Sequence, residues 1–125
     1  MGGELGGGSE RGRFGVFCRR VGVPLIDGGT IRRPRLMGAS RAMDMILTGR
    51  EVAPDEALSI GLANYVAPEG GAPDRALQLS NDIAAFPQTC MRADRLSAMR
   101  QLSLDIPTAL KVEVEGGMAV LKSGE

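Results

Sequence analysis

The sequence predicts an α/β fold in which helices dominate. Aromatic residues make up 3% of the 125 residues and Trp is absent, so aliphatic side chains must fill the interior, as is usual between packed helices. Gly and Pro divide most of the chain into segments with helical spacing of apolar residues. Two short apolar stretches, 14–26 and 62–66, have the pattern of extended segments. The length suits one domain.

The amino-terminal segment, MGGELGGGSERGR, contains six Gly and, besides Met1, one large aliphatic residue. Such a segment cannot bury enough apolar surface to offset the entropy of ordering its backbone. We therefore expect residues 1–13 to be a flexible Gly-rich arm and residues 14–125 to form the folded domain.

The stretch FGVFCRRVGVPLI, residues 14–26, is expected to be a strand or extended segment that enters a turn. Gly28 and Gly29 permit the backbone conformations and close approach that such a turn needs. Thr30 is a suitable N-cap for the short helix that follows, and Gly38 is its expected end.

Ser40 is the expected N-cap of the next helix, and Gly49 its C-terminal stop. The spacing predicts that Met43, Ile46 and Leu47 share one face of that helix.

Four further helices are predicted from their start signals and periodicity. Two begin at Pro54 and Pro73, a third spans 88–102, and the last begins near Thr108. The apolar positions of the last helix fall on one stripe, Leu110, Val114, Met118 and Leu121.

Composition excludes several classes of function. Lys and Arg number 15, as do Asp and Glu, and no basic run offers a phosphate track, so nucleic-acid binding is disfavoured. The chain has no His, which excludes a His-based triad and most zinc sites, and no metal site is expected. The two Cys are isolated, and no apolar run approaches the roughly 20 residues that span a bilayer. We expect no membrane contact, no secretion, and a cytoplasmic or mitochondrial-matrix location.

Asp27 is the candidate acid or base. It lies between apolar residues and a glycine pair, a setting that can desolvate a carboxylate and raise its pKa towards the working range of a general acid or base. The alternative is structural, because Asp before Gly-Gly commonly closes a turn or caps a helix by accepting backbone amides. Both interpretations stay open from the residues alone.

Two strings, VGVPLIDGGTIRRPRLMG at 21–38 and ILTGREVAPDEALSIGLANYV at 46–66, resemble the crotonase superfamily of enoyl-CoA hydratases and isomerases. The resemblance covers roughly residues 14–123 and corresponds to about the C-terminal half of a family member. It implies the crotonase-type (ClpP/crotonase-like) spiral fold, with this chain as its helix-dominated C-terminal part.

The resemblance also implies an acyl-CoA thioester substrate, backbone amides as an oxyanion hole, and a pair of carboxylates that handle water or protons. One family glutamate follows a Phe-Gly, and Cys18 stands in its position here, either as a substitute or as a small buried hydrophobe. The other follows a glycine-rich segment, to which Gly2-Gly3-Glu4-Leu5 is similar. The simpler interpretation of Glu4 is an exposed acid. Asp27 would then be the acid or base, and no cofactor beyond the coenzyme A of the substrate is implied.

For substrate binding, the resemblance points to Gly28, Gly29 and Arg32. Arg32 belongs to a group of arginines that could meet the phosphates of coenzyme A, form a solvated face, or make salt bridges between crotonase-like subunits, which assemble as trimers or hexamers in the family. The members of this group are Arg19, Arg20, Arg32, Arg33 and Arg35.

The leading hypothesis is an enoyl-CoA hydratase/isomerase-like protein of fatty acid metabolism that, in its complete form, adds water to an acyl-CoA or shifts its double bond. The alternative is a truncated, non-catalytic crotonase remnant that acts as an interaction or oligomerisation module. A third possibility is that the chain does not fold on its own.

Overall fold

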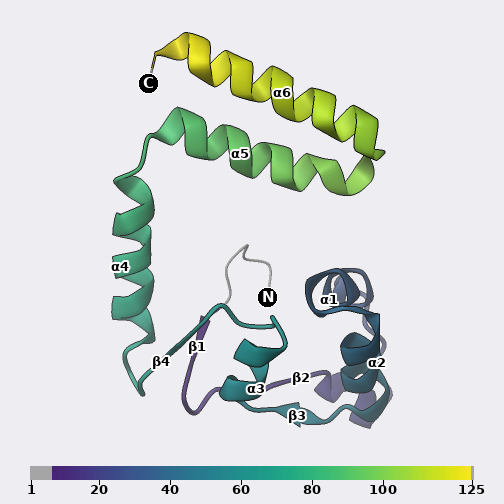
Figure 1. The fold of residues 1–125 in the computed structure, drawn as a ribbon. Helices are drawn as coiled ribbons and strands as arrows, with labels where there is room; N and C mark the ends of the chain where they lie inside the picture. Colours follow the sequence, from purple (N-terminus) through teal and green to yellow (C-terminus); the bar gives the residue numbers. More distant parts are fainter. Residues whose placement is uncertain (1–6, 125) are drawn as a thin grey trace. The chain divides into compact units, whose positions relative to one another are not determined.

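The computed structural model describes residues 7–124, which fall into two compact units (Figure 1). The first unit ends at Leu77 and the second begins at Gln78. Helix α4 (Ala72–Ala84) contains the boundary. Within the described residues, no helix is long and apolar enough to cross a membrane.

The first unit contains two separate two-stranded sheets. Strand β1 (Gly7–Ser9) runs parallel to β4 (Tyr65–Ala67), with Gly7 opposite Tyr65. Strand β2 (Phe14–Gly15) runs antiparallel to β3 (Glu51–Val52). These strands pair the start of the chain with segments that lie 36 or more residues later in the sequence.

Two expectations for the start of the chain differ from the structure. Residues 7–9 form a strand, although the sequence predicts a flexible arm over 1–13, of which residues 1–6 lie outside the described residues. The pairing of β1 with β4 is made by backbone hydrogen bonds, so the Gly-rich composition of residues 7–9 gives no sign of it. Only Phe14–Gly15 of the expected extended stretch is a strand, because the chain turns into the 3₁₀ helix η1 (Phe17–Val21), which the left-handed Gly22 ends.

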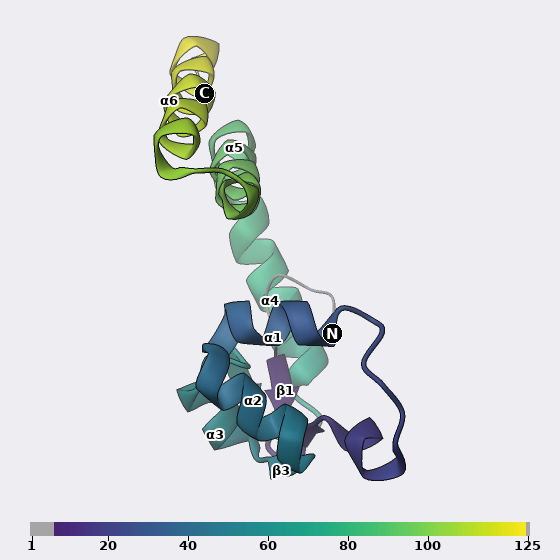
Figure 2. The same cartoon turned by 90° about the vertical axis from the view of Figure 1, so that its right-hand side faces the viewer.

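Helices α1 (Gly29–Met37) and α2 (Ala39–Thr48) follow, joined at Gly38 as predicted, and lie side by side in both views (Figures 1 and 2). Helix α2 begins at Ala39, so the expected cap at Ser40 is wrong.

The face predicted for α2 is also wrong in part. Ala42 and Met45 are buried, at 0% and 1% exposure, whereas Met43 and Leu47 are 45% and 65% exposed. Ile46 packs at the edge of the core. The inner stripe is therefore rotated by about one residue, because a ten-residue helix with apolar side chains on several sides does not fix its own orientation.

The core of the first unit gathers around these helices and the short α3 (Pro54–Ser59), which begins at Pro54 as predicted. Its cluster of buried side chains comprises Val16, Met37, Ala42, Met45, Val52, Ala57, Leu62 and Ala63. Met45 and Val52 are the largest fully buried side chains among the described residues.

The second unit is a helical hairpin. Helix α5 (Gln88–Arg100) and the short 3₁₀ helix η2 (Gln101–Ser103) precede α6 (Ile106–Ser123), and α5 and α6 lie antiparallel and side by side in both views (Figures 1 and 2). Asp105 caps α6 by accepting hydrogen bonds from the N–H and hydroxyl of Thr108, both at 2.9 Å.

The stripe predicted on α6 is exposed in this chain. Leu110, Val114, Met118 and Leu121 are 55%, 62%, 47% and 76% exposed, and none of the described residues from 78 onward is buried. The face of α6 with lower exposure carries Ala109, Val112, Gly116 and Val120 instead. The hairpin therefore leaves the apolar stripe of α6 exposed.

Candidate functional site

The site is built on the turn that starts α1. The backbone N–H of Gly29 donates a hydrogen bond of 3.0 Å to Oδ1 of Asp27, which closes the turn. Gly28 caps the helix with φ at 86°, a left-handed conformation that a side chain would disfavour. The structural role considered for Asp27 is therefore present, whereas the desolvation expected for its carboxylate is not, because Asp27 is exposed. Thr30 lies inside the helix rather than at its cap.

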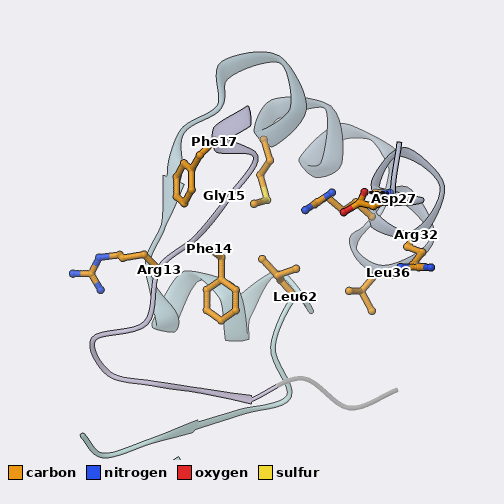
Figure 3. A pocket seen from close by; sticks show the side chains of 11 residues that line it. Arg13, Phe14, Gly15, Phe17, Asp27, Arg32, Leu36 and Leu62 are labelled. Atoms are coloured by element: carbon orange, nitrogen blue, oxygen red, sulfur yellow. Dashed lines mark hydrogen bonds between the residues drawn. The ribbon is translucent and has the colours of Figure 1, made fainter. Parts of the chain in front are cut away.

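Asp27 also lines a pocket of about 350 Å³. In Figure 3, Asp27 comes from the turn before α1 and Arg32 from α1 itself, and Phe14 and Phe17 lie across the pocket from them. The lining residues are Arg13, Phe14, Gly15, Phe17, Asp27, Gly29, Arg32, Arg33, Leu36, Met45 and Leu62. The walls are thus mostly apolar, with one carboxylate and guanidinium groups among them, which is the usual make-up of a small-molecule site.

Two arginines fold back over the glycine pair. Cζ of Arg32 would lie 3.3 Å from a Cβ placed on Gly28, and a Cβ placed on Gly29 would overlap Nη1 of Arg33. The missing side chains of Gly28 and Gly29 therefore leave the space that these guanidinium groups occupy. Arg32 is exposed and Arg33 is half-buried.

The aromatic wall is held by its neighbours. The ring of Phe17 packs so closely on Gly15 that a Cβ there would overlap it. The guanidinium of Arg20 lies 5.0 Å from the centre of the Phe17 ring, and its Nε donates a 2.8 Å hydrogen bond to the carbonyl of Gly49. Arg20 thereby connects the pocket wall to the turn after α2.

Arg50, next to that turn, joins α2 to α3. It donates to Oδ2 of Asp44 at 2.6 Å and to both carboxylate oxygens of Glu56, at 2.9 Å to Oε2. The hydrogen bonds from Arg50 lower the pKa of Glu56, and those to Glu56 and then Asp44 raise the pKa of Arg50. Because these groups lie outside the pocket, we assign them to the framework.

The other predicted residues lie elsewhere. Cys18 lines a separate hollow of about 250 Å³ with Val16 and Leu25, and is not among the residues of the Asp27 pocket. Glu4 lies outside the described residues. Within residues 7–124, no three His, Cys, Asp or Glu side chains are grouped as metal ligands would be.

Sequence reasoning missed the apolar walls of the pocket. Phe14 and Phe17 are two of the three Phe in the chain, and their spacing around Gly15 was the available signal. Leu36, Met45 and Leu62 come from three different segments, so only the tertiary structure brings them together.

The helix-rich α/β fold of this chain matches part of the fold of solved enoyl-CoA hydratases. The enoyl-CoA hydratase/isomerase family model matches residues 9–121. The crystal structure of an enoyl-CoA hydratase from Bacillus anthracis superposes with a TM-score of 0.89 at 26% identity, over 95% of this chain and 46% of that one. This chain belongs to the enoyl-CoA hydratase/isomerase family.

Two individual relatives are similar to this chain in sequence. The short-chain-enoyl-CoA hydratase of Clostridium acetobutylicum is 33% identical over 107 residues, which are 86% of this chain and 41% of that protein. The mevalonyl-coenzyme A hydratase of Beauveria bassiana is 30% identical over 115 residues, or 90% of this chain and 41% of that protein. The chain spans less than half the length of these relatives.

Proposed function

We propose that the chain supplies the acyl-binding pocket and one acid/base of an enoyl-CoA hydratase or isomerase that acts on an acyl-CoA thioester. The observation that carries the proposal is the position of Asp27 at the edge of an apolar pocket of about 350 Å³. Phe14, Phe17 and Leu62 would hold the acyl carbons there by excluding water. Family membership supports the choice of substrate class.

Asp27 would act through its free oxygen. Its Oδ1 accepts the N–H of Gly29, which fixes the carboxylate in one orientation. In a hydration, the other oxygen would take a proton from water as the water oxygen bonds to the β carbon, and the carboxylic acid so formed would return that proton to the α carbon. In an isomerisation, the same oxygen would carry a proton from one carbon to another. The chemistry would need no cofactor beyond the coenzyme A of the substrate. Cys18 and Glu4 stay predictions, the first from its position after Phe14-Gly15 and the second from its glycine-rich context.

Titration calorimetry tests this proposal, after circular dichroism has shown that the chain is folded. We expect saturable binding of crotonyl-CoA that is tighter than binding of coenzyme A alone. An Asp27→Asn variant keeps an oxygen for the Gly29 N–H, so it should stay folded and lose any conversion of crotonyl-CoA. Absence of binding by a folded sample would contradict the proposal.

A second function is favoured by the exposed stripe on α6. Leu110, Val114, Met118 and Leu121 are each at least 47% exposed. Such a surface fits an interaction module that packs on crotonase-like subunits. Size exclusion of the chain with a full-length family member would then show a complex, and crotonyl-CoA would not bind to the chain alone.

A further inference from the structure

The charges that line the Asp27 pocket do not balance. Three arginines and one aspartate contribute to its surface. Arg13 is paired, because its Nε lies 2.6 Å from a carboxylate oxygen of Glu51. Among residues 7–124, neither Arg32 nor Arg33 makes an ion pair. Asp27 is instead hydrogen-bonded to the backbone of Gly29. Asp27 offsets one of the two charges at most, so the pocket keeps an excess positive charge.

Helix stability does not account for the two guanidinium groups. They lie against Gly28 and Gly29, at the amino-terminal end of α1, where the helix dipole disfavours cations. The first turn of α1 contains no acidic residue that would compensate them. The glycine pair leaves room for both groups, so the arrangement concentrates positive charge beside apolar walls.

We propose that the acyl group held in this pocket ends in a carboxylate, and that Arg33, assisted by Arg32, binds that carboxylate. The inference rests on the proposed function, because it names the acyl-CoA class for the same site. Guanidinium groups bind carboxylates through paired, charge-assisted hydrogen bonds. The apolar walls would hold the carbons between the thioester and the terminal carboxylate, and the pocket volume of about 350 Å³ suits a short chain.

Arg33 is the stronger anchor of the two. It is half-buried, whereas Arg32 is exposed, and a charge-assisted bond strengthens as water is excluded. Arg35 lies on the same helix, is exposed and does not line the pocket, so it provides a matched control.

The test is calorimetric titration of the whole chain with three ligands: crotonyl-CoA, glutaconyl-CoA and coenzyme A. Glutaconyl-CoA is the crotonyl thioester with a terminal carboxylate added. We expect the chain to bind it about 10-fold or more tightly than crotonyl-CoA. Arg33→Gln should remove most of that preference, Arg32→Gln part of it and Arg35→Gln none. Raising the salt concentration should shrink the preference.

A terminal carboxylate and the phosphates of coenzyme A are alternative anions for these arginines, and the ligands separate them. If Arg33→Gln weakens all three ligands by the same factor, the anion is a phosphate and the inference is overturned. Equal affinity of the unmodified chain for crotonyl-CoA and glutaconyl-CoA also overturns it, while leaving the proposed function intact. Absence of binding for every ligand would overturn both. Arg33→Lys keeps the charge and should retain part of the preference if Arg33→Gln fails to fold.

Discussion

Gly29 donates its backbone N–H to Oδ1 of Asp27 at 3.0 Å, so one carboxylate both closes the turn before α1 and lines the pocket. The two roles can be separated by substitution. Asn keeps an acceptor oxygen and removes the charge, whereas Ala removes both.

For stability, Asp27→Asn should resemble the unmodified chain and Asp27→Ala should lower the free energy of unfolding by about 0.5–1.5 kcal/mol, the usual net value of one hydrogen bond. Urea denaturation followed by circular dichroism measures the difference. If Asp27→Ala were as stable as Asp27→Asn, the hydrogen bond to Gly29 would contribute nothing to the turn.

The orientation of α2 gives a second prediction. Met45 is 1% exposed in the core and also lines the pocket, whereas Met43, two residues earlier, is 45% exposed. Met45→Ala should cost about 2–5 kcal/mol of unfolding free energy, because it removes a buried side chain and leaves a cavity. Met43→Ala is the matched control and should cost much less. Equal losses of unfolding free energy in the two variants would contradict the orientation of α2 in the structure.

The sequence predicts the ends of elements better than their orientation. Gly38 and Gly49 end α1 and α2 as expected, since a left-handed or otherwise unusual backbone at those positions is a local requirement. The core-facing side of α2 is decided by what packs against it, and the strand at Gly7–Ser9 by the backbone of Tyr65–Ala67. Neither is encoded in the local pattern.

At the candidate site, too, local features could be predicted from the sequence and tertiary contacts could not. Asp27, Gly28 and Gly29 are adjacent in the chain, so their turn could be predicted. The wall of Phe14 and Phe17 could not, because it faces the turn only after the chain has passed through η1. Charge imbalance in the pocket depends on which arginines find acidic partners, which requires three-dimensional structure.

The ion pair of Arg50 with Glu56 predicts a pH dependence. Hydrogen bonds from Arg50 hold the pKa of Glu56 below its ordinary value of 4.5 in the folded state. The folded state therefore favours the ionised carboxylate, and this stabilisation is present in full well above 4.5 and is lost as the pH falls through the lower folded pKa.

Urea midpoints measured from about pH 7 to about pH 3 should fall less in Glu56→Gln than in the unmodified chain. Asp55→Asn is the control, because Asp55 is exposed on the same short helix and makes no ion pair within residues 7–124. Asp105, whose pKa is lowered by the Thr108 N–H and then by the Thr108 hydroxyl, adds a dependence of the same sign that both variants retain. Parallel curves for Glu56→Gln and the unmodified chain would exclude a role for the pair.

The Gly116-Gly117 pair in the middle of α6 gives the last prediction. Gly in a helix interior costs about 1 kcal/mol relative to Ala. A Cβ at either position would meet no atom within 4 Å, so this chain has no internal need for glycine there. Gly116→Ala and Gly117→Ala should each raise helicity and the melting temperature.

Gly117 lies on the same side of α6 as Leu110, Val114 and Leu121, at helical spacings of seven, three and four residues. If a partner helix approaches that stripe closely, Gly117→Ala should stabilise the isolated chain and weaken its association, as measured by size exclusion at several concentrations. Gly116, on the side of α6 with lower exposure, is the matched control. The higher helix propensity of Ala stabilises both variants alike. A loss of association in Gly117→Ala alone would therefore mean that Gly117 permits the close contact with the partner helix. Unchanged association in both variants would mean that the stripe binds without close approach of a helix.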